Sequence, residues 1–248
     1  MKANATKFQV LLITRDKSLP KLELQIDGTV LQSEPHIKLL GIHIDRELNF
    51  HYHITMMCQK ASNQVRAMAR LSYMLDAESK LVILNAFIIS NFMYCPLVWH
   101  MCSIVDSKKL EKIQKRALCY VFNDFNESYA NLLTMASKST LYISRLRMLV
   151  TEVFKALNDM SPNYMKSMFV KKEVMLNQRN NNILVQPKYN TVTYGFNSIR
   201  YQGSKLWNSL PNEMKCLDGI AQFRRMVRKW SGPVCNCGFC LQCTLMCQ

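Results

Sequence analysis

The sequence has few acidic residues and no two adjacent aspartates. It contains 17 Asp and Glu against 32 Lys and Arg. The acids Asp16, Asp27, Asp45 and Glu47 are scattered at expected turns and strand ends. Metal-dependent nucleotidyl transfer needs carboxylates that converge on two Mg²⁺ ions about 4 Å apart. We therefore expect no magnesium site, and we expect that this chain alone is not an enzyme of that kind.

Other catalytic and targeting signals are also missing. There is no P-loop, no dinucleotide glycine fingerprint, no His-Glu-x-x-His and no Gly-x-Ser-x-Gly. The first residues, MKANATKFQVLLIT, lack the apolar core of a signal peptide. An uncharged run over residues 81–99 is interrupted by Asn85, Asn91 and Pro96, which favours a buried helix and a turn over a membrane span. We expect reduced thiols and an intracellular protein, nuclear or cytoplasmic, that is neither secreted nor in a membrane.

Positive charge is what the sequence has in excess. The formal net charge is +15 over 248 residues, about half of them apolar, which is enough for one or two cores. A positive surface favours phosphate-rich partners through the release of counterions. RNA or DNA is the first candidate partner. Anionic membranes attract the same charge, so its sign alone does not choose between them.

The first fifty residues predict a small antiparallel sheet. Residues 8–13 form a β-favouring run, and Leu22, Leu24 and Ile26 alternate with polar neighbours before the hairpin signal Asp27-Gly28. Residues 37–44 read as one more strand.

From residue 51 onward the period becomes helical, so the predicted class is α+β with a mainly α-helical bundle after the strands. A long amphipathic helix follows Phe50, and an apolar helix over residues 79–94 is expected to be buried on all sides until Pro96 stops it. Three further helices are expected. The first is capped by Asp106 or Ser107, the second covers residues 141–158, and the third is capped by Asp218. Residues 171–201 are expected to be a long connection with a hairpin.

Cysteine and histidine offer two candidate metal sites. Cys235, Cys237, Cys240, Cys243 and Cys247 lie close enough to share one soft ion, and zinc is the natural choice. The spacing is not that of a standard paired-knuckle finger, so two alternatives stay open: four of these cysteines, Cys235 to Cys243, bind Zn²⁺, or the tail carries no metal. His51 and His53 supply half of a ligand set, and we expect them to serve structure or hydrogen bonding instead.

The stretch Lys38-Leu39-Leu40-Gly41-Ile42 resembles the Lys-Tyr-Leu-Gly-Ile strand that follows the catalytic palm motifs of LINE-type (non-LTR) retrotransposon reverse transcriptases. Further matches follow in order along nearly the whole chain: Ala86-Phe87-Ile88, Tyr94-Cys95-Pro96-Leu97 with Trp99, Leu110-Glu111 with Ile113-Gln114-Lys115-Arg116-Ala117-Leu118, Glu152-Val153-Phe154-Lys155, Pro162-x-Tyr164, Tyr194-Gly195, and Leu206-Trp207-Asn208-x-Leu210-Pro211. Asn4-x-x-Lys7 is similar to a motif just after the active site of that family, although Phe8 and Gln9 replace its Thr and Glu. On this alignment Met1 is an internal methionine of the ancestral polymerase, and the metal-binding aspartates lie upstream of it.

The resemblance implies a division of labour along the chain. Residues 1–50 would be a palm remnant with a primer-grip-like hairpin, 51–170 a helical thumb, 171–232 an irregular segment with a basic helix, and 233–248 a Cys-rich tail. Gly41 would let the backbone approach a nucleic-acid strand closely. The expected contacts to RNA or DNA, all independent of its sequence, are Lys38, Gly41, Lys60, Arg66, Arg70, Lys108, Lys112, Lys115, Arg116, Arg224 and Arg228.

Two interpretations of the whole chain follow. The first is a truncated reverse transcriptase-like protein of a transposable element, which lacks the catalytic aspartates and binds primer–template nucleic acid without reading its sequence. The second is a structural or protein-interaction remnant of a retroelement, which has no nucleic-acid role and whose partner would be another retroelement protein.

Overall fold

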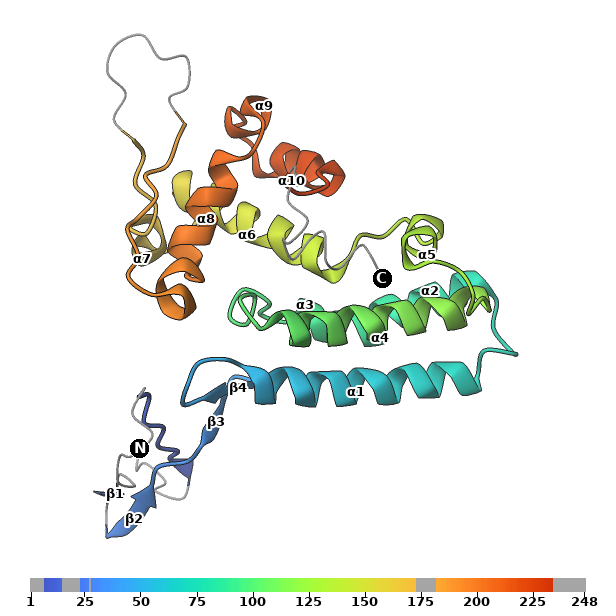
Figure 1. Cartoon of the computed structure of the whole chain (residues 1–248), viewed down its shortest axis with the longest axis horizontal. Coiled ribbons are helices and arrows are strands. Elements are labelled where there is room, and N and C mark those ends of the chain that lie inside the picture. Colours follow the sequence, from blue (N-terminus) through green and yellow to red (C-terminus); the bar gives the residue numbers. More distant parts are fainter. Residues whose placement is uncertain (1–6, 15–22, 27, 173–181, 234–248) are drawn as a thin grey trace. The chain divides into compact units, whose positions relative to one another are not determined.

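The computed structural model describes residues 7–14, 23–26, 28–172 and 182–233 (Figure 1). Within these residues lie two antiparallel hairpins followed by ten α-helices and two π-helical segments, so the α+β class is confirmed. The chain divides into two compact units. The first comprises Met1–Phe92 and Cys102–Ile113, and the second comprises Met93–Met101 and Gln114–Gln248.

The first hairpin forms where the sequence predicts it. Strand β1 (Glu23–Ile26) pairs with β2 (Thr29–Gln32), and Ile26 lies opposite Thr29. This register leaves a two-residue turn, in which Gly28 has a φ of 79°. Glycine adopts this left-handed conformation at little cost, which is why it suits such a turn.

Residues 37–44 form a hairpin, so the prediction of one strand there is wrong. Strand β3 (His36–Leu39) pairs with β4 (Ile42–Asp45). Leu40 and Gly41 have φ values of 47° and 87°, the two positive values of a tight turn that matches the twist of its strands. The strand predicted over residues 8–13 is also wrong, because that run provides only an isolated bridge between Val10 and Ser33.

Helix α1 (His51–Arg70) is the long amphipathic helix that the sequence predicts. The apolar stripe of α1 is buried. The loop that precedes the helix is held together by one carboxylate. There the Asp45 carboxylate accepts hydrogen bonds from the backbone N–H groups of Glu47, Asn49 and Phe50, at 2.6 to 3.1 Å. Asp45 therefore organises a loop, in the manner typical of short polar side chains at turns.

The next helical stretch consists of α2 (Ala77–Ile83), the π-helix η2 (Leu84–Ile89) and α3 (Ser90–Met93). The Asp76 side chain caps α2 by accepting from the Ser79 N–H at 2.8 Å. Burial on all sides, as predicted here, is wrong. Lys80, Leu84, Ile88 and Phe92 are buried, whereas other side chains of the stretch are exposed, among them Val82 at 63% and Phe87 at 58%.

Helix α4 (Ile104–Phe122) begins before Asp106, so the predicted cap at Asp106 or Ser107 is wrong. The Ser103 hydroxyl accepts from the Asp106 N–H at 3.1 Å, which is the bond of an N-cap. Asp106 instead lies in the first turn, where a carboxylate is favoured by the helix dipole. Residues 104–113 of α4 belong to the first unit and residues 114–122 to the second.

The second unit is built on α6 (Leu141–Leu157), as predicted apart from its last residue. Helices α8 (Ile199–Asn208) and α10 (Ile220–Lys229) contact α6, and the Phe154 and Phe223 rings stack in its core with centroids 4.1 Å apart. The predicted cap at Asp218 is wrong, because Gly219 holds that position without a side-chain hydrogen bond. The sequence did not indicate five elements of this unit: α5 (Tyr129–Met135), α7 (Asn163–Lys166), η3 (Val192–Phe196), α8 and α9 (Asn212–Lys215). Residues 171–201, expected to be a connection with a hairpin, contain η3 and the beginning of α8.

The Leu206-Trp207-Asn208 stretch has a structural role in this unit. The Trp207 indole N–H donates to the Asn182 carbonyl at 2.9 Å. Asn208 bonds both backbone groups of Leu184, accepting from its N–H at 2.8 Å and donating to its carbonyl at 2.9 Å. Gly203 lets α8 approach closely, since a Cβ there would lie 2.8 Å from the Phe169 ring. These residues fix the segment from 182 to 184 against α8.

Candidate nucleic-acid interface

Helix α1 presents a basic face to solvent in the first unit. Its buried residues, such as Ile54, Ala61 and Val65, lie on one side. With about 100° of rotation per residue, Lys60, Arg66 and Arg70 fall on the opposite side, where all three are exposed. The ion pairs seen among the described residues use none of these three cations. Their charges are therefore available to a partner.

Helix α4 carries a denser basic face. By the same rotation its cations occupy roughly 120° of the helix circumference, opposite its buried residues. Lys112 and Arg116 are exposed, and the others are partly buried. The members of this face within the first unit are Lys108, Lys109 and Lys112, and those within the second unit are Lys115 and Arg116.

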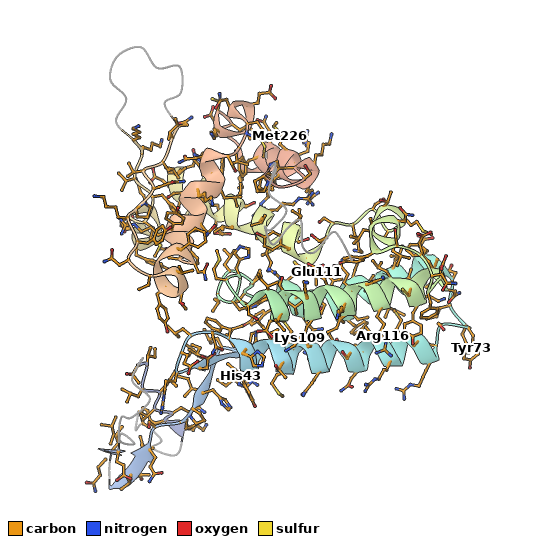
Figure 2. All side chains as sticks on the ribbon, viewed as in Figure 1. His43, Tyr73, Lys109, Glu111, Arg116 and Met226 are labelled. Atoms are coloured by element: carbon orange, nitrogen blue, oxygen red, sulfur yellow. The ribbon has the colours of Figure 1, made fainter. Side chains whose placement is uncertain are left out.

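A groove of about 510 Å³ lies beside α1 and is lined mainly by residues with polar side-chain groups. Lys109 of α4, which is labelled in Figure 2, lines its other side. The groove is lined by two cations, Arg66 and Lys109, together with neutral side chains that hydrogen-bond well, namely Thr55, Gln59, Ser62 and Asn63, and by Cys58. The Arg66 guanidinium donates to the Asn63 side chain at 3.4 Å. Hydroxyl, amide and guanidinium groups are the side chains that contact phosphate and sugar in nucleic-acid complexes.

The Asp106 carboxylate fixes the α4 side of this groove. Its side chain is only 2% exposed and accepts hydrogen bonds from His51 Nδ1 at 2.9 Å, Lys109 Nζ at 3.0 Å and Ser103 Oγ at 2.9 Å. Burial by itself raises the pKa of Asp106, but the bonds from His51, Lys109 and Ser103 outweigh it and leave the pKa below its usual value. Lys109 is thus held at the groove by a buried anion.

We expect Asp106→Asn to lower the free energy of unfolding by about 2 kcal/mol at neutral pH, because charge-assisted hydrogen bonds are lost from a buried position. A carboxyl whose folded pKa is depressed stabilises the fold above its unfolded pKa, about 4, and this contribution is lost as pH falls through the folded value. Urea unfolding at neutral and acidic pH measures both effects. The matched control is Asp218→Asn at an exposed site, and equal losses in the two variants would contradict the role of Asp106.

The Cys58 thiol in the groove is not suited to metal binding or nucleophilic attack. Burial raises its pKa to about 11, and the nearby Lys109 charge offsets this only in part. The thiolate is the form that attacks and that binds metal, so at neutral pH Cys58 is a neutral, inert lining residue.

The β3–β4 hairpin holds Lys38 and Gly41, both exposed. Lys38 lies opposite His43 in the register. Gly41 is explained by the turn alone, since its φ of 87° favours glycine whatever lies outside. Close approach of a strand to this backbone remains a prediction.

The histidines beside this hairpin form a ring cluster. His36 stacks on Tyr52 with centroids 3.9 Å apart, and the His43 N–H donates to His53 Nδ1 at 3.4 Å. Burial lowers the pKa of both His43 and His53, with smaller contributions from neighbouring Lys38 and His36 on His43 and from His43 on His53. His51 instead bonds Asp106. His51 and His53 therefore have hydrogen-bonding roles, as predicted.

Arg224 and Arg228 lie in the second unit, on the exposed side of α10. Both line a groove of about 330 Å³ against α6, together with Arg147 and Lys155. Two of these cations are already engaged: Arg147 donates to the Trp230 carbonyl at 2.7 and 2.9 Å, and Lys155 pairs with Glu152 at 2.6 Å. The exposed guanidinium groups of Arg224 and Arg228 are therefore the ones that could contact a partner.

Some residues of the metal predictions lie outside the described residues and others lie within them. Cys235, Cys237, Cys240 and Cys243 lie outside the described residues, as do Asp16 and Asp27. Among the described residues, no three His, Cys, Asp or Glu side chains are grouped so that they could hold a metal ion.

The neutral groove residues Thr55, Gln59 and Ser62 were not predicted from the sequence. Their signal was available, because with Arg66 they follow the steps of four, three and four that place residues on one face of a helix. Because these side chains are uncharged, the distribution of charge along the sequence does not single them out. Lys109 was not among the predicted contacts, and its ion pair with Asp106 is known only from the structure.

No family model matches the chain, and it matches neither a curated protein nor a solved structure. Each helix in the part of the chain that the structure describes is too short or too polar to cross a bilayer.

Proposed function

We propose that the chain binds RNA or DNA through phosphate contacts, without reading base sequence, on the α1–α4 face of its first unit. This face is defined by Arg66 and Lys109, which line the groove, and by Lys60, Arg70 and Lys112, which are exposed elsewhere on the same two helices. The observation that carries the proposal is the groove itself, in which Arg66 and Lys109 are interleaved with hydroxyl and amide side chains.

Electrostatics favours such a partner over an uncharged one. A net charge of +15 gives the chain a positive field that attracts polyanions from a distance. The groove then offers both cations and neutral donors, which is the mixture that holds a sugar–phosphate backbone. The groove lacks aromatic side chains, so nothing in it would stack on a base.

The resemblance to LINE-type reverse transcriptases supports the same proposal. In that family the thumb holds template and product, and the α1 and α4 residues are those that align with it. We propose accordingly a truncated, intracellular, nuclear or cytoplasmic retroelement protein, which holds primer–template nucleic acid and does not polymerise by itself.

Salt dependence of binding tests the proposal. If at least three or four phosphates are neutralised, the logarithm of the affinity for a duplex should fall with the logarithm of salt concentration with a slope of about −3 or steeper. Fluorescence anisotropy with two duplexes of unrelated sequence measures this slope, and we expect equal affinities for both. No binding by micromolar protein at low salt would overturn the proposal and favour the alternative, a remnant that binds another retroelement protein.

Zinc in the tail remains a separate proposal. The thiolates of Cys235, Cys237, Cys240 and Cys243 would suit a tetrahedral Zn²⁺ site. The support for this proposal is the ligand chemistry and close spacing of these cysteines. Zinc in a one-to-one ratio with protein purified under reducing conditions is the expected result, and its absence would leave the unmetallated alternative.

A further inference from the structure

Three aromatic rings pack together at the surface of the second unit. Tyr189 lies edge-on to Tyr201 and to Phe196, with ring centroids 4.8 and 5.5 Å apart. Phe196 and Tyr201 are 5.2 Å apart. The cluster is not sealed, because Tyr189 is 44% exposed and neighbouring Tyr194 is 37% exposed. Aromatic surface thus faces solvent beside a rigid group of rings.

The backbone is specialised to form this cluster. In η3 the N–H groups of Phe196 and Asn197 bond carbonyls five residues earlier, those of Thr191 and Val192. Gly195 lies so close to Tyr189 that a Cβ there would come within 2.7 Å of the tyrosine Cβ. Glycine at 195 therefore permits the contact, and the exposed Tyr194 directly precedes it in the chain. Short π-helical segments of this kind are frequent at functional sites.

The stretch of chain that forms the cluster carries charge of one sign. The sequence has no Asp or Glu between Glu173 and Glu213, whereas Lys188, Arg200 and Lys205 fall within this interval and are exposed. Lys188 and Arg200 adjoin Tyr189 and Tyr201 in the chain, and Lys205 Nζ lies 5.4 Å from the centre of the Phe196 ring. One cation therefore lies beside the rings, and two more adjoin the ring residues in the chain.

We propose that this aromatic surface, formed by Tyr189 and Tyr194 and flanked by Lys188, Arg200 and Lys205, binds single-stranded nucleic acid. The tyrosine rings stack on unpaired bases, and the three cations contact the phosphates. Aromatic rings beside a positively charged track are what holds single strands without sequence preference. An acidic peptide would satisfy the cations but would leave the exposed rings unused, so the combination favours a strand with bases. The inference concerns the second unit alone and does not depend on the α1–α4 face.

An abasic oligonucleotide separates base stacking from charge attraction. It keeps every phosphate of an oligothymidine of the same length and lacks the bases. We expect the intact chain to bind oligothymidine roughly tenfold more tightly than the abasic strand for each base stacked. Equal affinities for the two strands would overturn the inference and leave only phosphate attraction. This comparison uses the unaltered chain, so it does not depend on a variant that folds.

A variant then assigns the effect to the surface. Tyr194→Leu should lower oligothymidine affinity roughly tenfold and leave abasic-strand and duplex affinities unchanged, with circular dichroism as the check on folding. Tyr194→Trp should retain the preference for bases, and Tyr164→Leu, at another exposed tyrosine, is the matched control. A base preference that survives Tyr194→Leu in full would contradict the assignment. Failure of the α1–α4 face would instead abolish duplex binding and spare the preference for oligothymidine over the abasic strand.

Discussion

Arg66→Glu/Arg70→Glu is expected to bind duplex nucleic acid roughly 50-fold more weakly than the unaltered chain at about 0.1 M salt. Each lost phosphate contact removes about 0.9 from the salt slope, so the slope should become shallower by about 2. Both side chains are exposed on the outer face of α1, and neither supports the core, so the fold should persist. Anisotropy titrations over a range of salt concentrations measure affinity and slope together.

The matched control is Lys171→Glu/Lys172→Glu. These lysines are exposed in the second unit, and the double reversal changes the net charge by the same amount. A general field effect would weaken both variants alike, whereas a local interface predicts a large loss only for the α1 variant. Equal losses would show that the α1–α4 face has no special role.

Trp99→Ala is expected to lower the free energy of unfolding by about 4 kcal/mol, the usual cost of a large cavity in a core. Trp99 is fully buried in the second unit, and the buried Arg145 guanidinium lies 5.1 Å from the centre of its ring. Truncation would remove both the packing and this cation–π contact. Burial, with a contribution from Arg145, also lowers the pKa of neighbouring His100 to about 3, so the surroundings of Trp99 hold a neutral imidazole.

Trp230→Ala provides the comparison for this residue. It removes the same side chain from a partly exposed position at the end of α10, where the contact to Arg147 uses the Trp230 carbonyl and survives the change. We expect a loss of about 1 to 2 kcal/mol there, since less area is buried. Urea unfolding of both variants decides the matter, and a Trp99→Ala loss no larger than that of Trp230→Ala would contradict the core role.

Much of the fold could be predicted because its signals are local. The Asp27-Gly28 hairpin and the long helices α1 and α6 follow from turn chemistry and apolar periodicity. The turn at Leu40-Gly41 was missed because leucine rarely adopts a positive φ, so residues 37–44 looked like an uninterrupted strand. The short helices of the second unit were missed because one or two turns carry too few apolar positions to show a period.

The candidate interface also has a part that the sequence predicts and a part that it does not. The cations of α1 and α4 could be placed on outward faces from helical rotation alone. The groove could not be predicted, because it depends on which face of α4 meets α1 and on the pairing of Lys109 with Asp106 across three residues of the same helix. The aromatic surface around Tyr189 depends on a π-helical turn and on a glycine contact that no periodicity indicates.

The π-helix η2 fixes how many residues its segment must contain to keep a row of buried side chains on one side. Lys80, Leu84, Ile88 and Phe92 are spaced by four residues each and are all buried, although in an uninterrupted α-helix such a row drifts by about 40° per step. A π-helical turn takes more than four residues, so it cancels much of this drift. Removal of a single residue between 84 and 89 would rotate Phe92 by about 100° relative to Lys80. We therefore expect an insertion or deletion in this segment to disturb the buried row more than a volume-conserving substitution at one of its positions would.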